Sequence, residues 1–439
     1  MSAKKIWHTT SMLILLSLCT QNSIVAQIAI PGQALPDWRP GYLDLHHINT
    51  GWGDAAFYVF PDGTTMLFDA GEINPTDARA FTPRNAAMRP NYSKRAYEWI
   101  AHYIKKVAPK KKNAVIDYAA ISHFHDDHFG SWYPGAKLSV TGKYVLTGIT
   151  GVGELIPIQL LLDRNYPDYN YPYDIKKNMD KFSGEINFVK TMQNYFDFTA
   201  AQQQKGMKAA RFKAGSRSQV HMQYHPAQYP SFYVQNVKSN DQIWTGKDSN
   251  ATPFFPAIDS SKPGTWPSEN GLSLVFTIHY GPFTYYSGGD CGGVISYGDA
   301  WWKDVETPVA KVVGEVDIAT LDHHGNRDAV NEFQVSTFKP RVWIQQSWSS
   351  DHPGEEVLRR LTTPYLYDGP RDIFTTNMLD ANKYVIGPLI DRSYKSLQGH
   401  IVVRVLPGGK EYYVIILDDS REDMPVKDVF GPYQSKSKH

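Results

Sequence analysis

One short segment of the chain concentrates side chains that bind transition metals. Residues 122–130 read Ser-His-Phe-His-Asp-Asp-His-Phe-Gly, with three histidines and two aspartates within six positions. Imidazole nitrogens and carboxylate oxygens are ligands that zinc, iron and manganese accept. The segment follows a predicted buried strand, so His123 and His125 can point the same way while the chain is still extended. Asp127 and His128 then fall on the following turn, where they can address a second ion.

Two later segments offer the other groups that a binuclear centre needs, a bridging carboxylate and at least one more imidazole. Asp290 directly follows a strand-like run and two glycines, and we interpret it as the bridging ligand. His323 and His324 follow the next predicted strand. The sequence does not decide which of them is the ligand, and we favour His323. Each segment alone is typical of a turn, and it is their order after the first cluster that favours a metal centre.

Hydrophobic patterns predict the elements that position these residues. Alternating and continuous apolar runs predict strands, and apolar residues three and four apart predict a helix. Paired strands with helices between them indicate an α/β protein in which sheets are covered by helices. The expected strands are 42–45, 55–60, 65–68, 114–121, 272–278, 283–287, 316–321, 401–406 and 412–417, and the expected helix is 94–107. Residues 150–245 are rich in Tyr, Pro, Asn and Gln, and we expect an insertion of short helices and loops that forms a wall of the site.

Together these motifs resemble the metallo-β-lactamase superfamily. The resemblance is carried by His-x-His-x-Asp-His at 123–128, Gly-Asp at 289–290 and His-His-Gly at 323–325, and it extends over residues 41 to about 375. Further segments are similar to the branch that contains the hydrolase domain of DNA-uptake competence proteins. They are Gly53-Asp54-Ala55, Asp69-Ala70-Gly71, the run 270–275 and His352-Pro353.

The resemblance implies a four-layer αββα sandwich that holds two divalent metal ions. Zn²⁺ is the expected metal, with Mn²⁺ or Fe as alternatives. His123 and His125 would bind one ion and Asp127 and His128 the other, Asp290 would bridge them, and His323 or His324 would complete the second site. Asp69 would hydrogen-bond a ligand imidazole and fix its tautomer.

The implied activity is metal-assisted hydrolysis. A water that bridges two ions has its pKa lowered from 15.7 to roughly 7, so hydroxide is available at neutral pH to attack an acyl or phosphoryl centre. Asp127 would orient the nucleophile, and His324 or His352 would stabilise the oxyanion or protonate the leaving group. The resembled branch favours a phosphodiester or a similar ester as the substrate.

The sequence is also compatible with other functions. A β-lactamase or lactonase would be expected to carry a third histidine before Asp290, and the candidates His221 and His225 lie in no matching motif. A non-catalytic metal-binding module and a di-iron redox protein are the remaining alternatives. Cys291 is interpreted as a small buried residue rather than a soft ligand. Glu154 and Arg164 are candidates for substrate contact, although solvated surface positions are the plainer interpretation.

Composition and the N-terminal segment bear on partners and location. The formal net charge of the 439 residues is +1, which gives no strong nucleic-acid signal. Residues 1–26 have the charge, apolar run and small residues of a secretory signal peptide, with a lipoprotein anchored at Cys19 as the alternative. We expect export to the periplasm or beyond, no transmembrane segment and one domain over residues 27–439. The sequence does not determine the oligomeric state.

Overall fold

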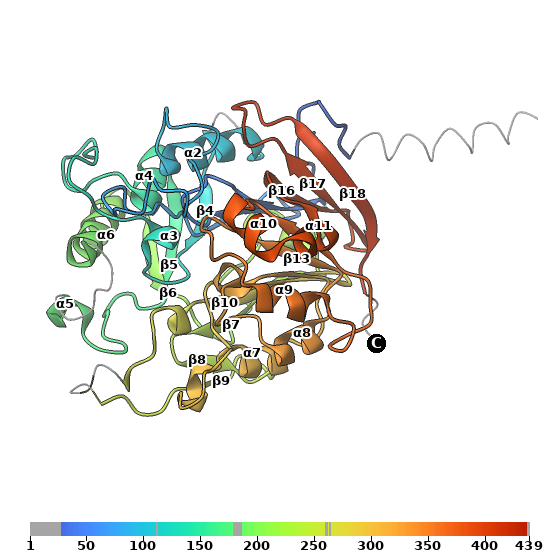
Figure 1. Ribbon diagram of the computed structural model, residues 1–439. Coiled ribbons are helices and arrows are strands. Elements are labelled where there is room, and N and C mark those ends of the chain that lie inside the picture. Colours follow the sequence, from blue (N-terminus) through green and yellow to red (C-terminus); the bar gives the residue numbers. More distant parts are fainter. Residues whose placement is uncertain (1–27, 111–112, 179–186, 260–261, 263–264, 437–439) are drawn as a thin grey trace, which may run out of the picture.

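The structure is a computed structural model that describes residues 28–110, 113–178, 187–259, 262 and 265–436. The chain forms a mixed α/β protein with two nine-stranded sheets (Figure 1). The predicted signal peptide and its cleavage site lie outside the described residues. Within the described ranges, none of the helices combines the length and the apolar character needed to cross a bilayer.

The first sheet has the strand order β18-β17-β16-β1-β2-β3-β4-β5-β6. Strands β3 to β6 are parallel to one another, and the other neighbours are antiparallel. The bounds are β1 Leu43–His47, β2 Ala56–Val59, β3 Thr65–Phe68, β4 Ile116–Ala120, β5 Ile158–Asp163, β6 Lys208–Arg211, β16 His400–Val405, β17 Glu411–Leu417 and β18 Val426–Gln434.

The second sheet has the order β15-β14-β13-β12-β11-β10-β7-β8-β9. Strands β11 to β15 are parallel, and β10, β7, β8 and β9 continue the sheet with antiparallel pairs. The bounds are β7 Phe232–Ser239, β8 Gln242–Trp244, β9 Ala251–Pro253, β10 Val275–Tyr280, β11 Phe283–Ser287, β12 Ile318–Thr320, β13 Val342–Gln345, β14 Asp372–Thr375 and β15 Tyr394–Ser396.

The helices fall into two groups along the chain. The first group comprises α2 Ala96–Val107, α3 Asp126–Phe129, α4 Gly148–Leu155, α5 Ile175–Asn178 and α6 Phe188–Gln203. The second comprises α7 Glu306–Val313, α8 Glu332–Phe338, α9 Glu355–Thr362, α10 Asp380–Ile386 and α11 Pro388–Ser393. Short 3₁₀ helices are η3 Pro226–Gln228, η5 Asn270–Leu272, η6 Trp301–Lys303 and η7 Asp322–Gly325.

Alternation along the strands sends side chains to opposite faces of each sheet. In β2, Phe57 and Val59 pack with apolar residues of α2, α4 and α6, whereas Ala56 and Tyr58 pack against residues of the second sheet. The opposite face of the second sheet packs with α7, α8 and α9. Figure 1 places α2, α4 and α6 on one side of the molecule and α7, α8 and α9 on the other. The inner core therefore fixes how the strand ends of one sheet meet those of the other.

Most of the expected elements are present. The hairpin β2–β3, helix α2, strands β4, β10, β11 and β12 and the hairpin β16–β17 all lie within three residues of their predicted bounds, and β3 and β11 match them. The structure differs over residues 150–245, where β5 and β6 extend the first sheet, β7 and β8 belong to the second, and α6 has 16 residues. Tyrosines of this region, such as Tyr169 and Tyr195, are buried core residues.

Three histidines of the first sheet are buried in their neutral form. Burial lowers the pKa of His46 and of His47 to about 4 and that of His400 to about 3. Nδ1 of His400 accepts a hydrogen bond from the backbone N–H of Asn49 (2.9 Å), which requires an unprotonated nitrogen. In the unfolded chain each imidazole takes up a proton below a pH of about 6.5. These residues therefore favour unfolding as the pH falls from about 6.5 toward 4.

We predict that His400→Asn makes the unfolding free energy less dependent on pH. The Asn Oδ1 keeps the acceptor for Asn49, and the titrating group is gone. Between pH 6 and pH 4.5 the slope should fall by about 1.4 kcal/mol per pH unit, because one proton is no longer bound on unfolding. Urea denaturation at several pH values measures the slope, and an unchanged slope would contradict the neutral buried state.

Candidate metal centre

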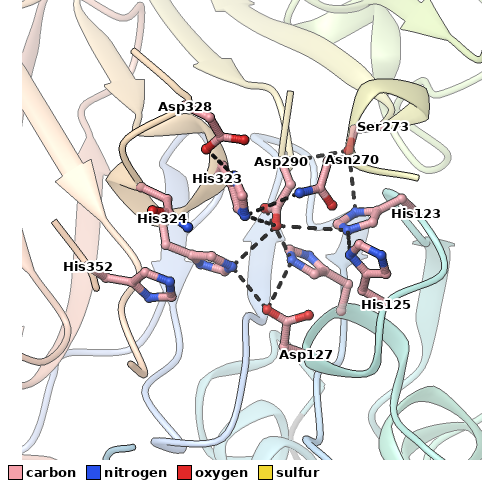
Figure 2. Close-up of polar contacts among 12 residues, drawn as sticks. His123, His125, Asp127, Asn270, Ser273, Asp290, His323, His324, Asp328 and His352 are labelled. Carbon is pink, nitrogen blue, oxygen red and sulfur yellow. Dashed lines mark hydrogen bonds and ion pairs between the residues drawn. The ribbon is translucent and has the colours of Figure 1, made fainter. Parts of the chain in front are cut away.

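The candidate site residues come from segments that follow parallel strands. Residues 123–128 follow β4, Asp290 follows β11, residues 323–324 follow β12, and His352 follows β13. Because parallel strands present their carboxyl ends at one edge of a sheet, the segments after β11, β12 and β13 share an edge of the second sheet, and the segment after β4 lies at the corresponding edge of the first sheet. Figure 2 shows the side chains converging from opposite sides.

Four buried side chains form the centre of this arrangement: Asp127, His128, Asp290 and His324. One possible ligand atom of each residue lies within 4.8 Å of those of the other three. Among the described residues, this group is the one whose geometry could hold a metal ion. Nε2 of His324 is 3.0 Å from Asp127 Oδ2 and 3.4 Å from Asp290 Oδ2. Nε2 of His128 is 3.2 Å from Asp290 Oδ1.

His123 and His125 lie beside this group. Nε2 of His123 is 3.0 Å from Nδ1 of His125 and 3.8 Å from Asp290 Oδ2. His123 is fully buried, and its Nδ1 lies 3.0 Å from the hydroxyl of Ser122 and 3.3 Å from that of Ser273. Asp290 therefore lies between the pair of histidines and the other three members of the group.

The local backbone explains how adjacent ligands point in different directions. Strand β4 ends at Ala120, and His125 is still extended, with φ −100° and ψ 151°. Helix α3 begins at the next residue, so Asp127 and His128 lie on a helical turn, as predicted. Gly71 permits the close approach that supports this turn, because a Cβ at residue 71 would lie 1.9 Å from the carbonyl oxygen of Asp127.

Two carboxylates and one indole contact the side chains of the group of four from the surrounding structure. Asp69 accepts from His128 Nδ1 (2.9 Å) and from the backbone N–H of Ser122 (2.7 Å), which matches its expected role. Asp54 lies 3.2 Å from Nδ1 of His324, and the indole N–H of Trp348 donates to Asp127 Oδ2 (2.9 Å). Such outer contacts fix the tautomer and the orientation of ligand side chains. Asp54 and Trp348 were not expected as contributors.

The sequence favours His323 over His324 as the additional ligand, and the structure places His324 in the group instead. Both residues adopt the left-handed conformation, with φ of 45° and 55°. The two side chains therefore diverge. His323 lies at the edge, where its Nε2 is 3.1 Å from the amide nitrogen of Asn270 and 3.9 Å from Asp290 Oδ2, and its Nδ1 is 2.6 Å from Asp328.

His352 lies behind His324 and outside the group of four. The two imidazole rings are stacked, with centroids 4.4 Å apart and an interplanar angle of 19°. Nδ1 of His352 is buried and has no hydrogen-bond partner. Burial, together with the neighbouring charge of His324, holds its pKa well below the ordinary value. His352 is therefore a neutral imidazole at the border of the site.

The remaining candidates lie elsewhere. Nδ1 of His221 bonds to the carbonyl oxygen of Ser218 and faces Tyr118, and neither His221 nor His225 belongs to the group that the described residues form. Cys291 is buried in the apolar core beside the second sheet, where burial raises the pKa of its thiol far above the ordinary value. This agrees with its interpretation as a small buried residue.

Arg164 and Glu154 are not solvated surface residues. Arg164 is fully buried and forms two 2.7 Å hydrogen bonds with the carboxylate of Glu269. Oε1 of Glu269 also accepts a hydrogen bond from the backbone N–H of Phe124, which lies between His123 and His125 in the sequence. Arg164 thus supports the metal-binding segment indirectly. Glu154 accepts from the hydroxyl of Tyr144 and makes no contact with the site.

Burial and mutual charge set the protonation of the centre. Burial alone would raise the pKa of Asp290, but the charges of His128 and His324 hold it well below the ordinary range. Conversely, burial opposes protonation of His324, and the carboxylates of Asp290, Asp54 and Asp127 hold its pKa well above the ordinary value. Positive charge is therefore required among these carboxylates. Protons supply it when no cation is bound.

The donor set fits a divalent cation. It combines two carboxylates with two imidazoles, and Nε2 of His128 is buried without a hydrogen bond of good geometry. Such oxygen and nitrogen ligands suit Zn²⁺, Mn²⁺ and Fe. No family model matches the chain, and a search of curated protein sequences finds no significant match. The site itself therefore carries the functional argument.

We predict that His324→Ala weakens zinc binding far more than His323→Ala does. Loss of His324 removes an atom from the group of four, whereas His323 lies at its edge. The affinity for the more tightly bound zinc ion should fall by about 100-fold or more in His324→Ala. In His323→Ala the same affinity should fall by less than about tenfold. Isothermal titration calorimetry on the two variants checks this, and equal losses would contradict the distinction between them.

Proposed function

We propose that this protein is a metal-dependent hydrolase of the metallo-β-lactamase superfamily that acts on a phosphodiester or a similar ester. The single observation that carries the proposal is the buried group of Asp127, His128, Asp290 and His324. Two mixed sheets that pack face to face, with helices over their outer faces, support the αββα assignment. Export directed by residues 1–26 is part of the proposal.

Asp127, His128, Asp290 and His324 would hold one ion. His123 and His125 would hold a second ion, with Asp290 shared between the two and His323 at the edge of that second position. The distances of 3.4 Å and 3.8 Å from Asp290 Oδ2 to His324 and His123 support the shared role. When bound, divalent ions lower the pKa of water and polarise an acyl or phosphoryl oxygen.

The protein's own groups would orient the reactants and carry protons. Asp127 is fixed through its Oδ2 by Trp348 and His324, so its carboxylate has one orientation in which to hold a proton of the attacking water. His352 is buried next to His324 with an unpaired Nδ1. We assign to the neutral imidazole of His352 a hydrogen bond from a ring N–H to the developing oxyanion.

The choice of ester rests on charge and on the missing third histidine. The net charge of +1 argues against a long polyanion as the substrate. A β-lactamase or lactonase would be expected to use a histidine between residue 128 and Asp290, and His221 and His225 lie away from the group of four. A phosphodiester or small ester therefore remains the preferred substrate class.

The test is hydrolysis of bis(4-nitrophenyl) phosphate by the zinc- or manganese-loaded protein, with metal content measured by elemental analysis. We predict chelator-sensitive turnover and a loss of about 10²–10⁴-fold in kcat for Asp127→Asn, because the proton-holding carboxylate is gone. His221→Ala, a histidine outside the group, is the matched control and should keep its activity. Bound metal with turnover of β-lactams or lactones alone would favour the alternative. Bound metal without any turnover would contradict the hydrolase.

A further inference from the structure

A cavity of about 520 Å³ lies next to the candidate metal centre, on the side of His323. Asn270 and Asp328 line the cavity, and both also contact the imidazole of His323. His323 Nε2 is in turn 3.9 Å from Asp290. The cavity and the centre thus share a boundary, and its volume lies in the range of small-molecule sites.

Aromatic rings contribute to the lining of this cavity. Phe255, Trp266 and Trp302 all line it. Trp302 packs edge-on against Phe255, with ring centroids 6.0 Å apart, and Trp266 is stacked on Tyr173 at 4.5 Å. These contacts hold the rings in fixed orientations before any ligand arrives. A preformed aromatic lining favours a ligand with a ring that can stack or pack against it.

The charged residues of the cavity argue against an anionic occupant. Among the described residues, its lining contains two carboxylates, Asp299 and Asp328, and one ammonium group, Lys303. Lys303 is paired with Asp299 at 2.5 Å, and Asp328 is paired with His323 at 2.6 Å. The ammonium group of Lys303 is thus already engaged. A phosphate or carboxylate would therefore find no unengaged cation among the described lining residues, whereas a neutral ring needs none.

We propose that this cavity binds a ring-bearing, non-anionic substituent of the substrate while the reacting ester group lies at the metal centre. The inference rests on the proposed hydrolase function and adds the substrate class to it. The substituent enters past Asn270 and His323, and Trp302 supplies the packing surface that selects for a ring. Trp301, which is 64% exposed and does not line the cavity, takes no part.

Two phosphonates test this proposal. Phenylphosphonate and methylphosphonate carry the same anionic head, so their difference in affinity reports the ring alone. For the zinc-loaded full chain, we expect calorimetry to show phenylphosphonate binding about tenfold more tightly than methylphosphonate. Trp302→Ala should reduce the ratio to about threefold or less, and the matched variant Trp301→Ala should keep it. Equal affinities in the unaltered protein would overturn the subsite.

A second variant guards against a loss of folding in Trp302→Ala. Val294 lines the cavity and is 38% exposed, so Val294→Trp fills the space without removing core packing. It should abolish the preference for the ring and leave methylphosphonate affinity unchanged. Retention of the preference in both Trp302→Ala and Val294→Trp would overturn the proposal. Methylphosphonate binding reports the metal centre in each variant, so failure of the proposed function is distinguishable from failure of the subsite.

Discussion

The arrangement of the candidate metal centre depends on the burial of two carboxylates. Asp127 and Asp290 are both almost completely shielded from solvent, and each approaches the imidazole of His324. Removing a carboxylate from water is costly unless opposite charge and hydrogen bonds compensate. Here imidazoles approach both acids, and Trp348 donates to Asp127. A bound divalent cation would supply the same compensation more directly, and it would bring those imidazoles into use as ligands.

The two-sheet arrangement is what brings the two acids together. Asp127 belongs to a turn after β4 of the first sheet, and Asp290 follows β11 of the second. The apolar core between the sheets fixes the distance between these strand ends. Outer residues then lock the side chains, with Asp69 on His128 and Asp54 near His324. The centre thus depends on packing far from it as well as on its own residues.

The parts of the site that are local in sequence could be predicted, and the parts that depend on long-range contacts could not. The segment 123–128 runs from a strand end into the following turn, so its pattern was sufficient to bring Asp127 and His128 together in the group of four, with His123 and His125 beside it. The choice of His324 over His323 depends on two consecutive left-handed residues, which neither residue type indicates. Trp348 joins the site only through the fold.

Arg164 shows that burial and sheet membership in residues 150–245 also depend on long-range contacts. A charged residue in a Tyr- and Pro-rich region suggests exposure, yet its guanidinium is buried by a bidentate pair with Glu269, 105 positions later in the chain. In the same region β6 and β8 are short, and contacts with strands far away in the sequence decide to which of the two sheets β5, β6, β7 and β8 belong. By contrast, the apolar runs of β16 and β17 were sufficient to predict these strands from the local sequence alone.

The most direct test of the central claim is a crystal structure of the zinc-soaked protein with anomalous data collected at the zinc edge. We predict an anomalous peak among Asp127, His128, Asp290 and His324, at about 2.0–2.2 Å from their ligand atoms. A second peak beside His123 and His125 would extend the centre to two ions. A structure without zinc among the four residues, or with zinc bound only elsewhere, would contradict the account.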